Sequence, residues 1–261
     1  MPSISVEWAG LIVTLLTAIV AAAWSVWRFT EDRKAVRARE RDRLAGLYVN
    51  PFLVACEDLQ SRLYNILVLG GLGALKGEDR EGKHHPAETL YLIAQYFGWE
   101  RRVLRYGPYT RDPTVTRLVL GIRATFAKDC DPSDPASDPG GAFCFFRIRQ
   151  ESLGRVAVQR VDSSSEPEFE SVGSFAFQKA VKDPAWTKFS SVQKTLAALD
   201  NTWTVDQLPG RWRLAEVQNS LVALLNYIEG KEGFKLYYKK RKTAQRDPGW
   251  IGWAKDHGWS L

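Results

Sequence analysis

The residues Trp212–Glu229, WRLAEVQNSLVALLNYIE, form the most regular stretch of the chain. Their apolar side chains recur at spacings of three and four residues, which places them on one face of an α-helix. Such a face is buried against other helices. The stretch therefore predicts a helical bundle, with these residues in its core: Leu214, Val217, Leu221, Leu224, Leu225 and Ile228.

Earlier stretches have the same period and extend the bundle. Asn50-Pro51 is typical of an N-cap followed by the first helical position, and glycines from Gly70 predict the end of that helix. Pro86 and Pro113 each precede a further amphipathic stretch, and residues 191–199 predict a shorter helix. Residues 143–146 are apolar and fit either a short strand or the start of a buried helix. The predicted fold class is mainly α, with at most a small β element.

A second kind of segment lies near the N-terminus. Residues Trp8–Trp27, WAGLIVTLLTAIVAAAWSVW, contain no charge, although mean hydropathy over the whole chain is −0.27. Twenty helical residues span about 30 Å, the thickness of a bilayer's hydrocarbon core, and Trp is typical of both interfaces. The segment predicts one transmembrane helix. A cleaved signal peptide is the alternative, but no basic residue precedes the apolar run, which is also too long.

The charges that flank this segment predict its orientation. No Lys or Arg precedes it, whereas a basic stretch follows it and is expected to lie at the membrane surface. The positive-inside rule places the short N-terminus outside and the rest in the cytoplasm, as in a bacterial inner-membrane protein. The apolar helix is expected to continue as a charged stalk, because no turn residue occurs before Gly46. The surface cations are Arg28, Arg33, Lys34 and Arg37.

Small side chains recur every four residues within the apolar segment. Gly10, Thr14, Ala18 and Ala22 form one row, and a parallel row runs from Thr17 to Ser25. In lipid, small residues at this spacing let two helices approach closely. The rows predict a homo-oligomer, although Ala and Thr are also common in single spans.

The domain boundaries follow from these segments. We expect an anchor at 1–29, a basic juxtamembrane helix at 30–48, a cytoplasmic helical domain at 49–232 and a basic, Trp-rich tail at 233–261. Three interpretations of the tail are ranked: its Trp side chains dock on the bundle with the cations solvated, it lies on the membrane, or it binds nucleic acid, which is the weakest. The tail residues concerned are Lys239, Lys240, Arg241, Lys242, Trp250 and Trp253.

Four segments resemble a known family: ACEDLQSRLYNIL (55–67), TLYLIAQYFGWERRVLR (89–105), FRIRQESLGRV (146–156) and RLAEVQNSLVALLNYIE (213–229). They are similar to an uncharacterised family of bacterial proteins with one N-terminal span and a helical cytoplasmic domain. The resemblance covers most of the chain outside the span and the tail. It implies the fold only, because that family has no established activity and supplies no functional residues.

Motifs for metal, cofactor or nucleotide chemistry are missing from the sequence. The three histidines have no zinc-binding spacing, so we expect no metal and no cofactor. Cys56, Cys130 and Cys144 form no CxxC pair, which favours free thiols in a reducing compartment. The glycines before Lys76 fail the P-loop pattern, since Gly77 follows the lysine.

One pattern does point to an enzyme. Arg80 and His85 have the R-x4-H spacing that resembles the motif of HEPN ribonucleases, although a solvated loop leading to Pro86 is the favoured explanation, because Gly82 interrupts the stretch and Glu81 departs from the motif. The leading hypothesis is therefore a non-enzymatic, self-associating membrane module. It would act through a protein partner or by perturbing the bilayer, as some bacterial defence effectors with one span do. The alternative is a membrane-tethered ribonuclease.

Overall fold

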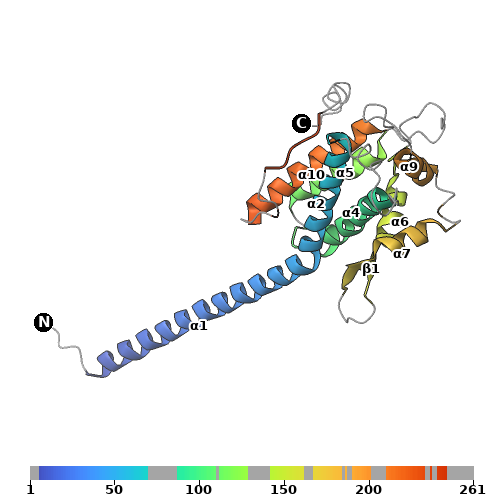
Figure 1. Cartoon of the computed structure of the whole chain (residues 1–261). Helices are drawn as coiled ribbons and strands as arrows, with labels where there is room; N and C mark the ends of the chain where they lie inside the picture. Colours follow the sequence, from blue (N-terminus) through green and yellow to red (C-terminus); the bar gives the residue numbers. More distant parts are fainter. Residues whose placement is uncertain are drawn as a thin grey trace. The chain divides into compact units, whose positions relative to one another are not determined.

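The computed structural model confirms a mainly helical chain (Figure 1). It divides into two compact units, residues 1–46 and 47–261. The described residues, to which every statement below is confined, are 6–69, 87–109, 112–128, 142–161, 167–183, 186, 190–200, 210–232, 236 and 240–245.

The first unit is formed by α1, which runs without interruption from Val6 to Leu44. The apolar segment and the charged segment after it therefore belong to one helix, as predicted. Side chains from Thr14 to Arg43 are all exposed. Within the part of the chain that the structure describes, no helix is both long and apolar enough to cross a membrane, so the predicted span is not supported.

The prediction of an N-cap at Asn50 is wrong. A single π-helical turn, η1 (Ala45–Val49), leads directly into α2 (Asn50–Leu67), and no side chain caps that helix. Pro51 lacks an N–H, and its ring would clash with the carbonyl group four residues earlier in an α-helix. The wider π turn relieves this clash while the chain stays helical.

Five helices build the second unit around an aromatic core. The long helix α10 (Arg211–Glu232) packs against α2 and α5 (Pro113–Ala127), while α4 (Ala87–Tyr106) packs against α2 and α6 (Arg147–Ala157) (Figure 1). Phe97, Phe126 and Phe145 meet between α4, α5 and the start of α6, with ring centroids 5.1–6.1 Å apart. The second unit also contains two short helices, α7 (Ser174–Val181) and α9 (Ser190–Asp200).

The small β element exists, but not where the sequence placed it. Strands β1 (Val158–Arg160) and β2 (Phe169–Ser171) pair antiparallel, with Val158 opposite Ser171. Residues 143–146 are neither strand nor helix. Phe143 has a positive φ of 61°, and its N–H donates to the Thr195 hydroxyl at 2.7 Å. Tertiary contacts therefore fix this segment, and its local sequence could not reveal them.

The cysteine prediction is wrong in one respect. Cys56 is free and buried, but Cys144 is part of a disulfide. The thiols therefore no longer argue for a reducing compartment.

Helices α4 and α6 touch through two glycines. A Cβ atom on Gly98 would lie 2.4 Å from Val158 Cγ2 and 2.7 Å from the Gly154 carbonyl oxygen. A Cβ atom on Gly154 would lie 2.7 Å from the Gly98 nitrogen. Only glycine permits this approach, because these distances are shorter than any van der Waals contact.

We predict that Gly98→Ala lowers the free energy of unfolding by about 1–3 kcal/mol, because the new methyl group forces the two helices apart. Urea unfolding of the full chain measures this. Gly230→Ala on α10 is the matched control, since its Cβ atom meets nothing within 4 Å. The control should be neutral or stabilising by up to about 1 kcal/mol. Equal stability of the Gly98 variant and the wild type would show that the contact carries no constraint.

Candidate functional site

Several residues singled out from the sequence lie outside the described residues. These are Arg80 and His85 of the ribonuclease hypothesis, and Lys239, Trp250 and Trp253 of the tail. Among the described residues, no group of His, Cys, Asp and Glu side chains could hold a metal ion.

The predicted assembly residues all belong to α1. Gly10, Thr14, Ala18 and Ala22 follow one another at intervals of one helical turn, and the last three have exposed side chains. The Thr14 hydroxyl donates to the Gly10 carbonyl at 2.9 Å, so its polarity is satisfied inside the helix. The row therefore presents a smooth face with no polar group that requires another partner.

The basic residues that follow on α1 are partly neutralised within the helix. Lys34 pairs with Glu31 at 2.7 Å, and the Arg33 guanidinium lies 4.2 Å from the centroid of the Phe29 ring. Arg28 and Arg37 are exposed. Exposed ion pairs of this kind contribute little to stability. The stretch keeps its cations at the surface, where an anionic surface could attract them.

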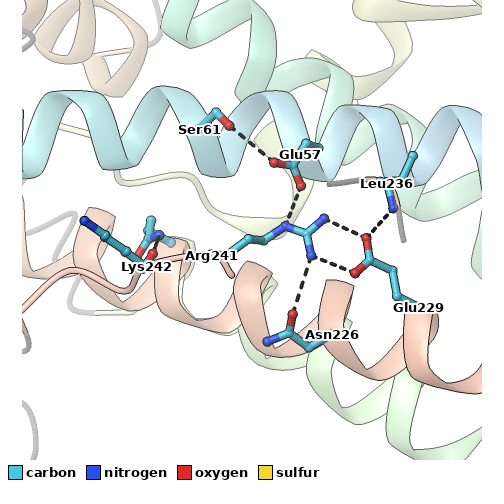
Figure 2. A network of polar contacts seen from close by, with 8 residues as sticks. Glu57, Ser61, Asn226, Glu229, Leu236, Arg241 and Lys242 are labelled. Carbon is cyan, nitrogen blue, oxygen red and sulfur yellow. Dashed lines mark hydrogen bonds and ion pairs between the residues drawn. The ribbon is translucent and has the colours of Figure 1, made fainter. Parts of the chain in front are cut away.

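The most developed polar site involves Arg241 of the tail (Figure 2). Its Nε donates to Glu57 on α2 at 2.6 Å. Its Nη1 and Nη2 donate to the two carboxylate oxygens of Glu229 on α10, at 2.9 and 2.7 Å. Asn226 accepts a longer bond from Nη1 at 3.4 Å. The Arg241 side chain is only 3% exposed. The prediction that the tail cations are solvated is therefore wrong at this residue, whereas Lys240 and Lys242 are exposed.

Two amide side chains of α10 bind the main chain of the same segment. The N–H group of Ala244 donates to Gln218 Oε1 at 2.9 Å and to Asn219 Oδ1 at 3.0 Å. In return, Gln218 Nε2 donates to the Lys242 carbonyl at 2.9 Å, and Asn219 Nδ2 donates to the Ala244 carbonyl at 3.2 Å. Residues 240–245 are thus held along α10 by ion pairs at one end and by amide–backbone hydrogen bonds at the other.

The sequence contained a weak signal for this site. Glu57 and Glu229 each adjoin the apolar face of their helix, as do Gln218 and Asn219. Charged residues beside an apolar face usually belong to its solvated edge. Only the fold shows that Glu57 and Arg241, 184 residues apart in the chain, meet in the same place.

A second polar cluster lies inside the bundle. Glu100 on α4 is 2% exposed, and its Oε1 lies 3.4 Å from Arg123 Nη1 on α5. Gln150 on α6 accepts from Arg123 Nε at 3.3 Å and donates to the Phe145 carbonyl at 2.7 Å. Burial raises the pKa of Glu100 to about 7, although Arg123 opposes the shift. The carboxyl group is therefore close to half protonated at neutral pH.

No activated nucleophile accompanies this carboxyl group among the described residues. Burial raises the pKa of Cys56 and of Tyr96 well above their usual values, so both stay neutral at pH 7. The Tyr96 hydroxyl makes no hydrogen bond to the described residues. The cluster joins α4, α5 and α6 through polar contacts, and nothing in it is arranged for covalent chemistry.

Comparisons with known protein families, with curated proteins and with solved structures find no match. The resemblance to the bacterial membrane family therefore stays a prediction. The function must be argued from the residues of the chain itself.

We predict that the stability of the chain depends on the proton of Glu100. Its pKa is raised from 4.5 to about 7 on folding, so the folded state binds this proton more tightly. The stabilisation is complete below pH 4.5 and is lost as the pH rises through 7. A shift of this size corresponds to about 3 kcal/mol.

Urea unfolding of the full chain at pH 5 and at pH 8 measures this dependence. Glu100→Gln should remove about 2.5 kcal/mol of the loss seen in the wild type, because part of the full shift lies below pH 5. Glu170→Gln, at an exposed position on β2, should leave the pH dependence unchanged. A wild-type profile that Glu100→Gln does not alter would contradict the raised pKa.

Proposed function

We propose that the chain is a membrane-anchored helical protein that self-associates through α1. Its folded unit would act through a protein partner, or the assembled helices would perturb the bilayer. The proposal goes beyond the structure, in which no described helix meets the requirement for a span. It rests on the uncharged residues 8–27 and on the apolar surface that they expose.

The exposed apolar surface of α1 is the observation that carries the proposal. Nine large apolar side chains within residues 8–27 are each more than half exposed, and three of them are tryptophans. Isolated apolar residues on a surface are ordinary, but a continuous apolar stretch needs a cover. A helix that is apolar on all sides is covered by lipid or by other protein. These side chains are Trp8, Leu11, Leu15, Leu16, Ile19, Val20, Trp24, Val26 and Trp27.

The side chains of α1 are sorted by size around the helix axis. With about 100° per residue, those large side chains occupy an arc of roughly 220°. The remaining arc holds Gly10, Thr14 and Ala18 together with the row from Thr17 to Ser25, while Ala22 lies just inside the edge of the large arc. A large arc suits lipid tails, and a smooth small arc suits the close approach of a second helix. The sorting therefore favours a lipid-embedded helix that packs against another copy of itself.

The proposed orientation rests on charge asymmetry alone. Residues 1–27 contain no Lys or Arg, while Arg28, Arg33, Lys34 and Arg37 follow at once. This asymmetry favours an external N-terminus and a cytoplasmic folded unit, as in a bacterial inner membrane, whereas the disulfide at Cys144 is typical of an oxidising compartment and counts against it. The ribonuclease hypothesis gains no support, because Arg80 and His85 lie outside the described residues.

We predict that Leu16→Asp prevents stable insertion of α1 into lipid. A carboxylate near the centre of a span costs about 2.5–3.5 kcal/mol, so the vesicle-bound fraction should fall at least tenfold. Flotation of the full chain with phospholipid vesicles after an alkaline wash measures this. Val36→Asp is the matched control, because Val36 is 63% exposed and Leu16 is 56% exposed on the same helix. Equal flotation of both variants, or a wild type that does not float, would refute the anchor.

We predict that Ala18→Leu reduces self-association in detergent, because the larger side chain keeps two helices apart. Ala23→Leu makes the same chemical change about 140° away, on the arc of large residues, and should leave the particle unchanged. Light scattering of the detergent-solubilised full chain gives the particle mass. If the two variants have the same mass, the small-residue rows do not form the assembly face.

A further inference from the structure

The surface that holds the tail contacts both a side chain and the main chain of residues 241–244. We call this contact surface the tail groove and define it by Glu57 on α2 and by Asn226 and Glu229 on α10, which Figure 2 shows around Arg241. It also includes Gln218 and Asn219 of α10, which bind the main chain of the tail. Each group of the bound segment that could specify a ligand has a partner there. The guanidinium group meets two carboxylates, and the main chain meets two amides.

The contacts define which sequence the groove accepts. The Arg241 side chain is buried between two carboxylates. Its guanidinium group presents donors in a planar fork, which the single ammonium group of a lysine cannot reproduce. Ala244 is buried three residues later, where a large side chain would not fit. Lys242 and Thr243, between them, are exposed. The groove therefore selects an Arg-x-x-Ala segment in an extended conformation.

The distance between the two ends of the groove on α10 matches the length of such a segment, whether or not the segment is joined to α10 through the chain. Arg241 lies at Asn226, and Ala244 lies at Asn219. Seven helical residues cover about 10 Å, and three extended residues cover about the same distance. The segment runs antiparallel to α10, and seven residues separate it from the end of that helix at Glu232. None of the contacts requires the segment to come from the same chain.

We propose that the tail groove also binds the tail of a second copy of this chain. An exchanged tail would make the same ion pairs and the same amide–backbone hydrogen bonds, so exchange costs little energy beyond association itself. The contact rests on the proposed function in one respect, because copies held together by α1 present the tail at a high effective concentration. The contact itself lies outside α1.

Two full-length variants separate the donor of the tail from its acceptor. The tail variant, Arg241→Gln, keeps an intact groove but cannot fill it with its own arginine. The groove variant, Glu57→Gln with Glu229→Gln, keeps an intact tail but cannot hold it. In detergent solution, a tagged tail variant is mixed with the untagged groove variant, and a tagged groove variant is mixed with an untagged copy of itself. Only the first pair combines an intact groove with an intact tail, so exchange predicts several-fold better capture in the first pair than in the second.

This comparison isolates the groove from the helix α1, which both pairs share. If α1 does not associate, capture falls equally in both pairs, and the difference between them remains. Equal capture by both pairs overturns the proposal, whether or not α1 associates.

A peptide probe provides the second measurement. A fluorescent peptide with the sequence of residues 236–246 should bind the tail variant at least tenfold more tightly than it binds the groove variant. The same peptide with Gln in place of its arginine should bind the tail variant at least tenfold more weakly. Fluorescence anisotropy gives both affinities. Equal binding of the two peptides overturns the proposal.

The removal of Arg241 leaves the buried carboxylate of Glu229 and the half-buried carboxylate of Glu57 without their cation, which destabilises the tail variant. The peptide should raise the melting temperature of the tail variant, because a ligand that binds only the folded state of a protein stabilises that state. Arg241→Lys replaces Arg241→Gln if the latter does not fold, since it keeps the charge and loses the fork. Absence of any peptide effect on the melting temperature of a folded variant also overturns the proposal.

Discussion

The desolvation of charged groups is the constraint that organises the second unit. A guanidinium group taken out of water must have its donors satisfied, because an uncompensated buried charge costs several kcal/mol. Arg241 meets this requirement with two carboxylates. Two donors of Arg213 bind the carbonyl groups of Lys128 and Ala142, and those of Arg102 bind the carbonyl groups of Gly98 and Val158. Apart from the Arg102–Gly98 bond, which lies within one helix, these contacts join segments far apart in the sequence, so the buried arginines help to specify which elements of the bundle are neighbours.

The buried and half-buried carboxyl groups divide into two kinds for the same reason. Glu57 and Glu229 share a bidentate arginine at 2.6–2.9 Å, which compensates for their desolvation. Glu100 has only a 3.4 Å contact with Arg123, and its pKa rises to about 7. The first kind fixes the tail on the bundle. The second makes the stability of the interior sensitive to pH near neutrality.

Apolar side chains are buried in the second unit and exposed in α1. In the second unit, aromatic side chains such as Phe97, Phe126 and Phe145 cover one another. In α1, side chains of comparable hydrophobicity stay exposed over about five turns. Such a surface gains about 25 cal/mol for each Å² that a partner removes from water. Lipid and a second copy both provide that cover, which is why anchoring and self-association enter the proposed function together.

The sequence by itself determined the local structure, because helical periodicity and capping depend on neighbouring residues. It predicted α5 with its Pro113 start, the apolar face of α10, the continuity of α1 beyond residue 30 and the mainly α class. It also predicted the helix at 191–199, which the structure has as α9 (Ser190–Asp200).

Only the tertiary structure decided how distant residues combine. The π turn before Pro51, the position of the β pair, the disulfide at Cys144 and the pairing of Arg241 with Glu57 were all missed. The β pair, the disulfide and the ion pair depend on contacts between residues far apart in the sequence, which local periodicity does not encode. The π turn is a local response to Pro51, but the spacing of Asn50 and Pro51 fitted an N-cap as well. Composition and spacing marked Arg241 as a solvated cation of the tail. Burial between two carboxylates made it the residue that holds the tail in place.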